Sequence, residues 1–197
     1  MASFQAIAAV AEAVVAQLKQ AYSAALFDGN ALDFKVFGSA QFKDGLTTPG
    51  VSLFVYRIVP NGAHRTPGGG LARDGRRMRT SLPVEVHFLL TAWAADPSLQ
   101  TAVAGYMMRV LEDHPTLPAS ELNRVYPQAF RPEESVEIVL GEMRNEDLFQ
   151  LWDRLTERGY QLSVPYLARV LLIDSLEDSA VEAPVKVRDV GLEQGVD

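Results

Sequence analysis

The chain has 197 residues, 48% of them hydrophobic and 22% charged, which is the composition of a globular protein with a single core. Its formal net charge of −7 argues against wholesale nucleic-acid binding, because an acidic body and a polyanion repel each other at long range. No cysteine is present, which excludes disulfides and thiol nucleophiles. No apolar run approaches the ~20 residues of a membrane-spanning helix. The N-terminal run lacks a basic region and contains Glu12, so we expect neither a signal peptide nor membrane insertion.

The chain opens with a predicted amphipathic helix. Apolar residues recur at helical spacing from Ile7 to Leu26, while Glu12 and Lys19 fall on the other side. Ser3 is placed to cap the start of this helix, and residues 28–30 supply the turn that ends it.

Two strands are predicted next, over residues 33–37 and 51–59, with a turn-rich stretch between them. The second is the stronger prediction, because both of its faces are largely apolar before Pro60 ends it. Simple alternation places four residues on one face: Val51, Leu53, Val55 and Arg57.

Residues 60–83 predict a long loop, since Pro67 and the glycines Gly68, Gly69 and Gly70 oppose regular structure. The clearest strand of the chain follows over residues 83–93. Its alternation places Val84, Val86, Phe88 and Leu90 on one face and Glu85, His87 and Leu89 on the other.

The second half alternates helices and strands. Asp96 and Pro97 start a second helix, and residues 117–132 predict a short helical turn and a connector. A strand over residues 135–140 precedes a third helix, for which Asn145 is the expected cap and Gly159 the expected end.

The last predicted strand covers residues 160–174. Alternation places six residues on one face: Leu162, Val164, Tyr166, Ala168, Val170 and Leu172. Pro165 within it indicates an edge position or a bulge.

These elements predict an α+β fold with a single mixed β-sheet packed by about three helices, a long basic loop and a C-terminal arm. We expect one domain over residues 1–176. Residues 177–197 are acidic and lack a continuous pattern, which is typical of an arm or a flexible tail.

The sequence gives little support for catalysis. His64, His87 and His114 fall in a loop, a strand and a helix end, and no metal-ligand spacing connects them. The three glycines of the long loop lack the Lys and Ser or Thr of a phosphate-binding loop. We therefore expect no enzyme activity, no cofactor and no metal.

Two segments instead suggest binding to partners. The long loop concentrates five arginines, Arg65, Arg73, Arg76, Arg77 and Arg79, opposed only by Asp74. Such a segment either remains solvated or docks on an acidic surface of another protein. In the C-terminal arm, Val181, Val185 and Val187 alternate with charged residues. That segment is either a solubilising tail or a strand added to another subunit.

Four blocks in chain order carry a resemblance to a known family. They are FQAIAAVAEAV from Phe4, GVSLFVYRIVPN from Gly50, LPVEVHFLLTAWA from Leu82 and SVPYLARVLLID from Ser163. Together they resemble the N-terminal domain of the cap proteins, also called tail-terminator or tube-terminating proteins, of extracellular contractile injection systems, which are phage-tail-like particles.

The resemblance implies a structural subunit. Cap subunits of this kind form a hexameric ring on the last layer of the inner tube protein and engage the last ring of the sheath protein. Assembly in the cytoplasm, followed by release with the particle, is implied in the same way. Two alternatives stay open: a phosphate- or nucleotide-binding enzyme subunit that uses the arginine- and glycine-rich loop, and a nucleic-acid packaging or adaptor protein.

Overall fold

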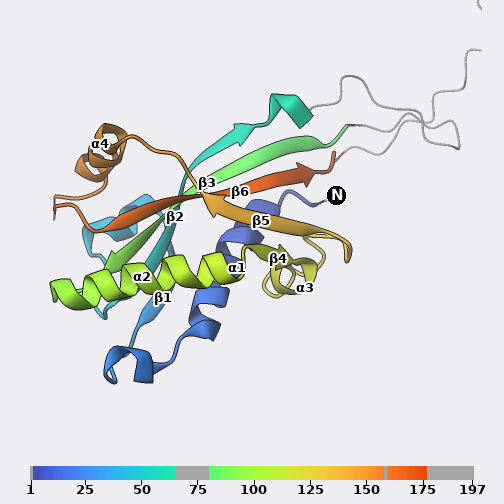
Figure 1. Ribbon diagram of the computed structural model, residues 1–197. Coiled ribbons are helices and arrows are strands. Elements are labelled where there is room, and N and C mark those ends of the chain that lie inside the picture. Colours follow the sequence, from blue (N-terminus) through green and yellow to red (C-terminus); the bar gives the residue numbers. More distant parts are fainter. Residues whose placement is uncertain (1, 65–79, 158, 177–197) are drawn as a thin grey trace, which may run out of the picture. The chain divides into compact units, whose positions relative to one another are not determined.

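A computed structural model describes residues 2–64, 80–157 and 159–176, and the elements below lie in the compact unit of residues 1–65 and 81–174. One sheet has the strand order β1-β2-β3-β6-β5-β4 (Figure 1). The strands are β1 (Asp33–Phe37), β2 (Gly50–Pro60), β3 (Leu82–Trp93), β4 (Thr116–Pro118), β5 (Ser135–Leu140) and β6 (Ser163–Ile173). The β1–β2 pair is parallel and the other neighbouring pairs are antiparallel. The predicted α+β class with a mixed sheet is therefore confirmed.

The helices of the described part are three long ones and several short ones. The α-helices are α1 (Ala6–Ala21), α2 (Pro97–Asp113), the single turn α3 (Ala119–Leu122) and α4 (Asn145–Leu155). The 3-10 helices are η1 (Ala24–Phe27), η2 (Ser39–Lys43) and η3 (Gly62–His64). The three predicted long helices are thus confirmed, whereas the short edge strand β4 was not predicted.

The ends of two helices differ from the prediction. The first helix stops at Ala21, because Tyr22 turns into an extended conformation and packs its ring on Phe27 and Phe34, with centroids 6.0 and 5.7 Å apart. Its N-cap is Gln5, so Ser3 does not cap it; the Ser3 hydroxyl accepts a hydrogen bond from the Gln5 backbone instead.

At α4, Arg144 is the N-cap and Asn145 already belongs to the helix, which ends at Leu155, before Gly159. The start of α2 is as predicted. There the Asp96 carboxylate accepts a 2.7 Å hydrogen bond from the backbone N–H of Leu99, and Pro97 is the first helical residue.

One face of the sheet is closed by α1 and α2, which Figure 1 shows on the side opposite α4. The predicted alternation of β3 is confirmed, since Val84, Val86, Phe88 and Leu90 are all buried against these helices. Aliphatic residues dominate this main core: Val10, Val14 and Leu18 from α1, and Val103, Met107 and Leu111 from α2. Burial of this size provides most of the stability of the unit.

The other face is covered at one end only. There α4 and η2 pack on β3 through a smaller, mainly aromatic cluster made of Phe37, Phe42, Leu89, Trp93, Leu148 and Trp152. The Trp93 indole donates a 2.8 Å hydrogen bond to the buried Ser52 hydroxyl. Leu89 neighbours Leu90 in sequence, so a single strand contributes to both clusters.

The last strand departs from simple alternation. Val84 and Val86 of β3 pair with Leu171 and Ala168, so β6 has one extra residue at this point. This β-bulge moves Leu171 onto the main-core face and leaves Leu172 exposed. The prediction that Val170 and Leu172 share a face with Tyr166 is therefore wrong.

Pro165 lies elsewhere than predicted. The strand β6 is internal, between β3 and β5, and its bulge lies closer to Ile173 than to Pro165. Pairing with β5 begins only at Tyr166. Pro165 therefore precedes that ladder, where its missing N–H removes no strand hydrogen bond.

Candidate interaction surface

The residues predicted from sequence to bind partners lie outside the described residues. They are Arg65, Arg73, Arg76, Arg77 and Arg79 in the basic segment, and Val181, Val185 and Val187 in the C-terminal segment. The three glycines of the long loop, Gly68, Gly69 and Gly70, also lie outside the described residues.

The two edges of the sheet differ. At one edge, β4 is three residues long and ends at Pro118, a length and composition that discourage pairing with another strand. At the other edge, β1 has five residues and no outer strand partner in the described part of the chain. This edge leaves backbone groups available for another chain.

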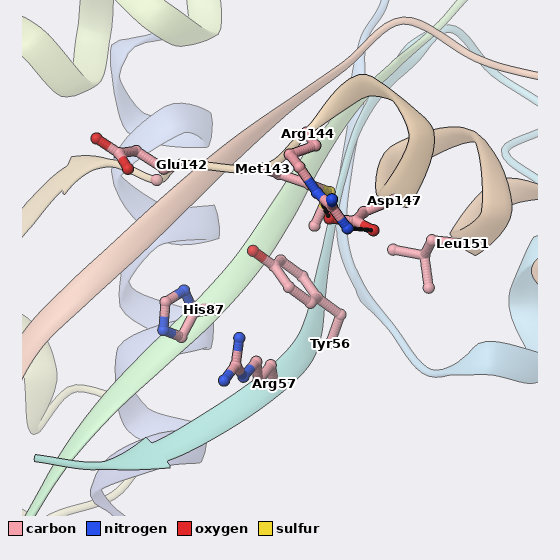
Figure 2. Close-up of a pocket in the computed structure, with 9 residues that line it drawn as sticks. Tyr56, Arg57, His87, Glu142, Met143, Arg144, Asp147 and Leu151 are labelled. Atoms are coloured by element: carbon pink, nitrogen blue, oxygen red, sulfur yellow. Dashed lines mark hydrogen bonds and ion pairs between the residues drawn. The ribbon is translucent and has the colours of Figure 1, made fainter.

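A groove lies on the second face, beside the aromatic cluster. It has a volume of about 810 Å³ and is lined by Tyr56, Arg57, His87, Gly141, Glu142, Met143, Arg144, Asp147 and Leu151. These residues come from β2, β3, α4 and the segment between β5 and α4 (Figure 2). The groove forms because α4 covers only one end of the face.

The floor of the groove carries three polar groups. The Tyr56 and His87 rings lie 6.0 Å apart, and Arg57 extends beside them (Figure 2). Among the described residues, the Tyr56 hydroxyl, the Arg57 guanidinium and the His87 ring have no hydrogen-bond or ion-pair partner. Three unused donors therefore face a space that another molecule can enter.

The electrostatics of the floor are those of a cationic site. Burial first, and then the nearby Arg57 charge, lower the pKa of His87, while Glu85 acts in the opposite direction. Burial raises the pKa of Tyr56, and Arg57 partly offsets this. His87 is therefore neutral and Tyr56 protonated at neutral pH, which leaves Arg57 as the charged group of the floor.

On the opposite wall, two of the charged side chains form an ion pair. Arg144 donates two hydrogen bonds of 2.9 Å to the carboxylate of Asp147, one to each oxygen. This contact lowers the pKa of Asp147 and satisfies both side chains. Met143 and Leu151 add apolar surface beside the pair, and the Glu142 carboxylate turns away from Tyr56 and Arg57 in Figure 2.

A bulge in β2 creates the floor. Val55 pairs with Phe88 and Arg57 with His87, so Tyr56 is an extra residue. The prediction that Arg57 shares a face with Val51, Leu53 and Val55 is therefore wrong, because the bulge moves Arg57 to the groove. The sequence did contain a signal for this bulge, because the charged Arg57 occupies a position that the alternating pattern assigns to the apolar face.

The described residues show no arrangement typical of catalysis. His64 contacts Asn61, His87 lies in the groove, and the His114 backbone carbonyl accepts a hydrogen bond from Gln17. No group of three potential metal ligands occurs in residues 2–64, 80–157 and 159–176. Within the same residues, no helix has the length and hydropathy needed to cross a membrane.

Comparison with solved structures shows where this fold occurs. The cryo-EM structure of the anti-feeding prophage cap (AFP tube terminating cap) matches with a TM-score of 0.63 at 17% identity, over 93% of this chain and 60% of that chain. The sheath/tube terminator of the extracellular contractile injection system PVC, in its extended state, matches with a TM-score of 0.57 at 19% identity, over 95% of this chain and 63% of that chain. This chain thus spans about three fifths of each.

Sequence comparison identifies the family. None of the curated proteins matches the chain significantly. The family described as the Pvc16 N-terminal domain, however, matches residues 9–186, a range that includes every strand of the sheet, α2, α4 and all of α1 except its first three residues. The chain therefore belongs to the Pvc16 N-terminal domain family.

Proposed function

We propose that this chain terminates the inner tube of a phage-tail-like contractile injection particle and engages the last sheath ring, as a structural subunit without catalysis. The family match over residues 9–186 is the observation that carries the proposal. The fold shared with a tube terminating cap and with a sheath/tube terminator supports it.

The subunit forms a ring of six under this proposal, with inner tube protein on one side and sheath protein on the other. A ring closes by heterologous contacts, in which one surface of a subunit meets a different surface of the next. The β1 edge, which has no outer strand in the described part of the chain, and the groove beside α4 are two different surfaces available for such contacts. Assembly occurs in the cytoplasm, and the subunit then leaves with the particle.

The arginine-rich segment is a contact in this assembly. The segment contains five arginines and one aspartate in a chain with a net charge of −7, so an acidic surface of the tube, the sheath or the next subunit attracts it. The alternative of a phosphate- or nucleotide-binding enzyme subunit rests on the same segment. The cap function also accounts for the family and the fold.

Tube assembly in vitro tests the proposal. Tube protein polymerised with and without the chain is imaged by electron microscopy. We expect a ring at one end of each tube, six subunits per ring by mass measurement, and tubes that stop growing. A chain that leaves tube length unchanged and does not bind tube ends would contradict the proposal.

Charge reversal separates the role of the arginine-rich segment. Replacing Arg76, Arg77 and Arg79 by Glu should weaken end binding in a salt-dependent way. The matched control reverses Arg109, Arg124 and Arg154, which are exposed on the described surface. Equal weakening by both triple variants would show that net charge, and not this segment, is responsible.

A further inference from the structure

We infer that the groove of Figure 2 binds the C-terminal segment, residues 177–197, of a neighbouring copy of this chain, with the Glu182 carboxylate against Arg57. The ring arrangement in this inference rests on the proposed function. The groove and the charge of the segment are independent of it.

The groove has the chemistry that an acidic and partly apolar segment needs. Its floor offers the Arg57 guanidinium, which has no ion-pair partner within residues 2–64, 80–157 and 159–176, together with the hydroxyl of Tyr56 and the ring of His87. A guanidinium and a hydroxyl both donate to carboxylate oxygens, and hydrogen bonds to a charged acceptor are the strong ones. Met143 and Leu151 provide apolar surface in the same groove.

The anions of the groove do not cancel this preference. Asp147 is held by two hydrogen bonds from Arg144, and Glu85 accepts a 2.7 Å hydrogen bond from Asn61. Glu142 is exposed at the rim and turned away from Arg57 (Figure 2). Arg57 is thus the cation of the groove that no carboxylate of the described residues pairs with.

The composition of the C-terminal segment complements that of the groove. It is acidic, and its Glu182 is flanked by Val181 and, three residues further on, Val185. One carboxylate between two small apolar side chains corresponds to one cation beside two apolar side chains.

The position of β6 favours a neighbour as the acceptor. The first residue of β6, Ser163, pairs near the aromatic cluster and α4, while Ile173 pairs with Leu82 at the opposite end of the sheet (Figure 1). The chain therefore runs past its own groove, where Leu167 pairs with His87, before it leaves the sheet. Residues 177–197 span at most ~70 Å when fully extended, which is enough to reach an adjacent subunit.

Photo-crosslinking in the chain of residues 1–197 tests the inference. The photoreactive amino acid p-benzoylphenylalanine replaces Glu142 at the rim, and isotopically light copies that carry it are mixed with heavy copies that do not. Mass spectrometry then identifies the crosslinked peptides. We expect links from the light rim to heavy peptides within residues 177–197.

Charge variants establish the contact. Arg57→Glu should lower the crosslink yield about tenfold, as for the loss of one ion-paired contact, and adding Glu182→Arg should restore it. The matched controls are Arg154→Glu, outside the groove on α4, and Glu193→Arg, in the same segment; neither should change the yield.

Several outcomes would overturn the inference: links within one copy only, links to the arginine-rich segment, no links at all, or a yield insensitive to Arg57→Glu. Capping of tubes is measured separately on each variant. A chain that caps tubes without these links contradicts only this inference, whereas one that forms the links without capping contradicts the proposed function.

Discussion

The two faces of the sheet are built by the same strands, but helices cover them to different extents. Two long helices, α1 and α2, cover one face and bury an aliphatic core. The other face receives the shorter α4, which covers one end and leaves the groove beside it. Leu89 and Leu90 are adjacent in sequence and equally buried, at 0% exposure, but belong to different clusters.

The two faces therefore differ in role: the closed face stabilises the fold, and the half-open face is available for binding. The closed face carries most of the buried apolar surface and so most of the free energy of folding. The half-open face holds polar groups without partners in the described chain, Arg57 among them. Such groups contribute little to folding and are available for recognition.

The largest expected effect compares Leu90→Ala with Leu89→Ala. Leu90→Ala should lower the free energy of unfolding by about 3–5 kcal/mol, because the sheet and two long helices hold the cavity open. Leu89→Ala should cost about 2–3 kcal/mol, since one short helix can shift to fill the space. Urea denaturation of both variants measures the difference. An equal or larger loss for Leu89→Ala would show that the second face is as rigid as the first.

A smaller effect distinguishes the two tryptophans of the aromatic cluster. The Trp93 indole N–H donates to Ser52, whereas the indole N–H of Trp152 is buried with no hydrogen-bond partner among the described residues. Trp93→Phe leaves the Ser52 hydroxyl buried and unpaired, while Trp152→Phe removes a donor that was already unpaired. We expect Trp93→Phe to be more destabilising by about 1 kcal/mol.

Thermal and urea denaturation of the two variants test this order. The double variant Trp93→Phe with Ser52→Ala is the control, because it removes both hydrogen-bond partners and should recover part of the loss. Equal destabilisation by the two single variants would mean that the Trp93–Ser52 hydrogen bond contributes nothing net.

Local sequence patterns were sufficient to predict most of the fold. The strand at residues 33–37 and the strand at residues 135–140 have the predicted bounds. The Asp96 and Pro97 signal correctly placed the start of α2. In each case the determining interactions are local: period-two alternation, or a side chain that caps its own helix.

The groove could not be predicted, because it depends on pairing between distant residues. Both β-bulges reverse the alternation within a strand, one at Tyr56 and one near the end of β6. A bulge is recognised only from the pairing with the partner strand. For the bulge at Tyr56 the partner strand is β3, and His87 on it is about thirty residues away in the sequence. Gly50 illustrates the same limit: a Cβ there would lie 1.9 Å from the Asp33 carbonyl oxygen, a close approach that only the β1–β2 pairing reveals.

The smallest expected effect concerns the pH dependence contributed by the floor of the groove. Burial and Arg57 lower the pKa of His87 in the folded chain, against the opposing influence of Glu85. Other charged groups line the groove, namely Glu142, Arg144 and Asp147. Because the unfolded chain binds a proton at His87 more readily than the folded chain, the free energy of unfolding decreases as the pH falls.

We therefore expect wild type to lose stability relative to His87→Gln as the pH falls through about 6.5, the usual pKa of histidine. The difference should stay below about 1 kcal/mol, because solvent screens a half-buried ring. Below the lowered pKa of the folded state it should stop growing, since both states are then protonated. Urea denaturation between neutral pH and mildly acidic pH measures the difference, and other titrating groups cancel between the two proteins.

The control is Arg57→Gln. It should reduce the pH-dependent loss of stability due to His87, because one of the two causes of the lowered pKa of His87 is removed. A wild type that gains stability over His87→Gln on acidification would show that Glu85 dominates the ring and that the floor is not a cationic site.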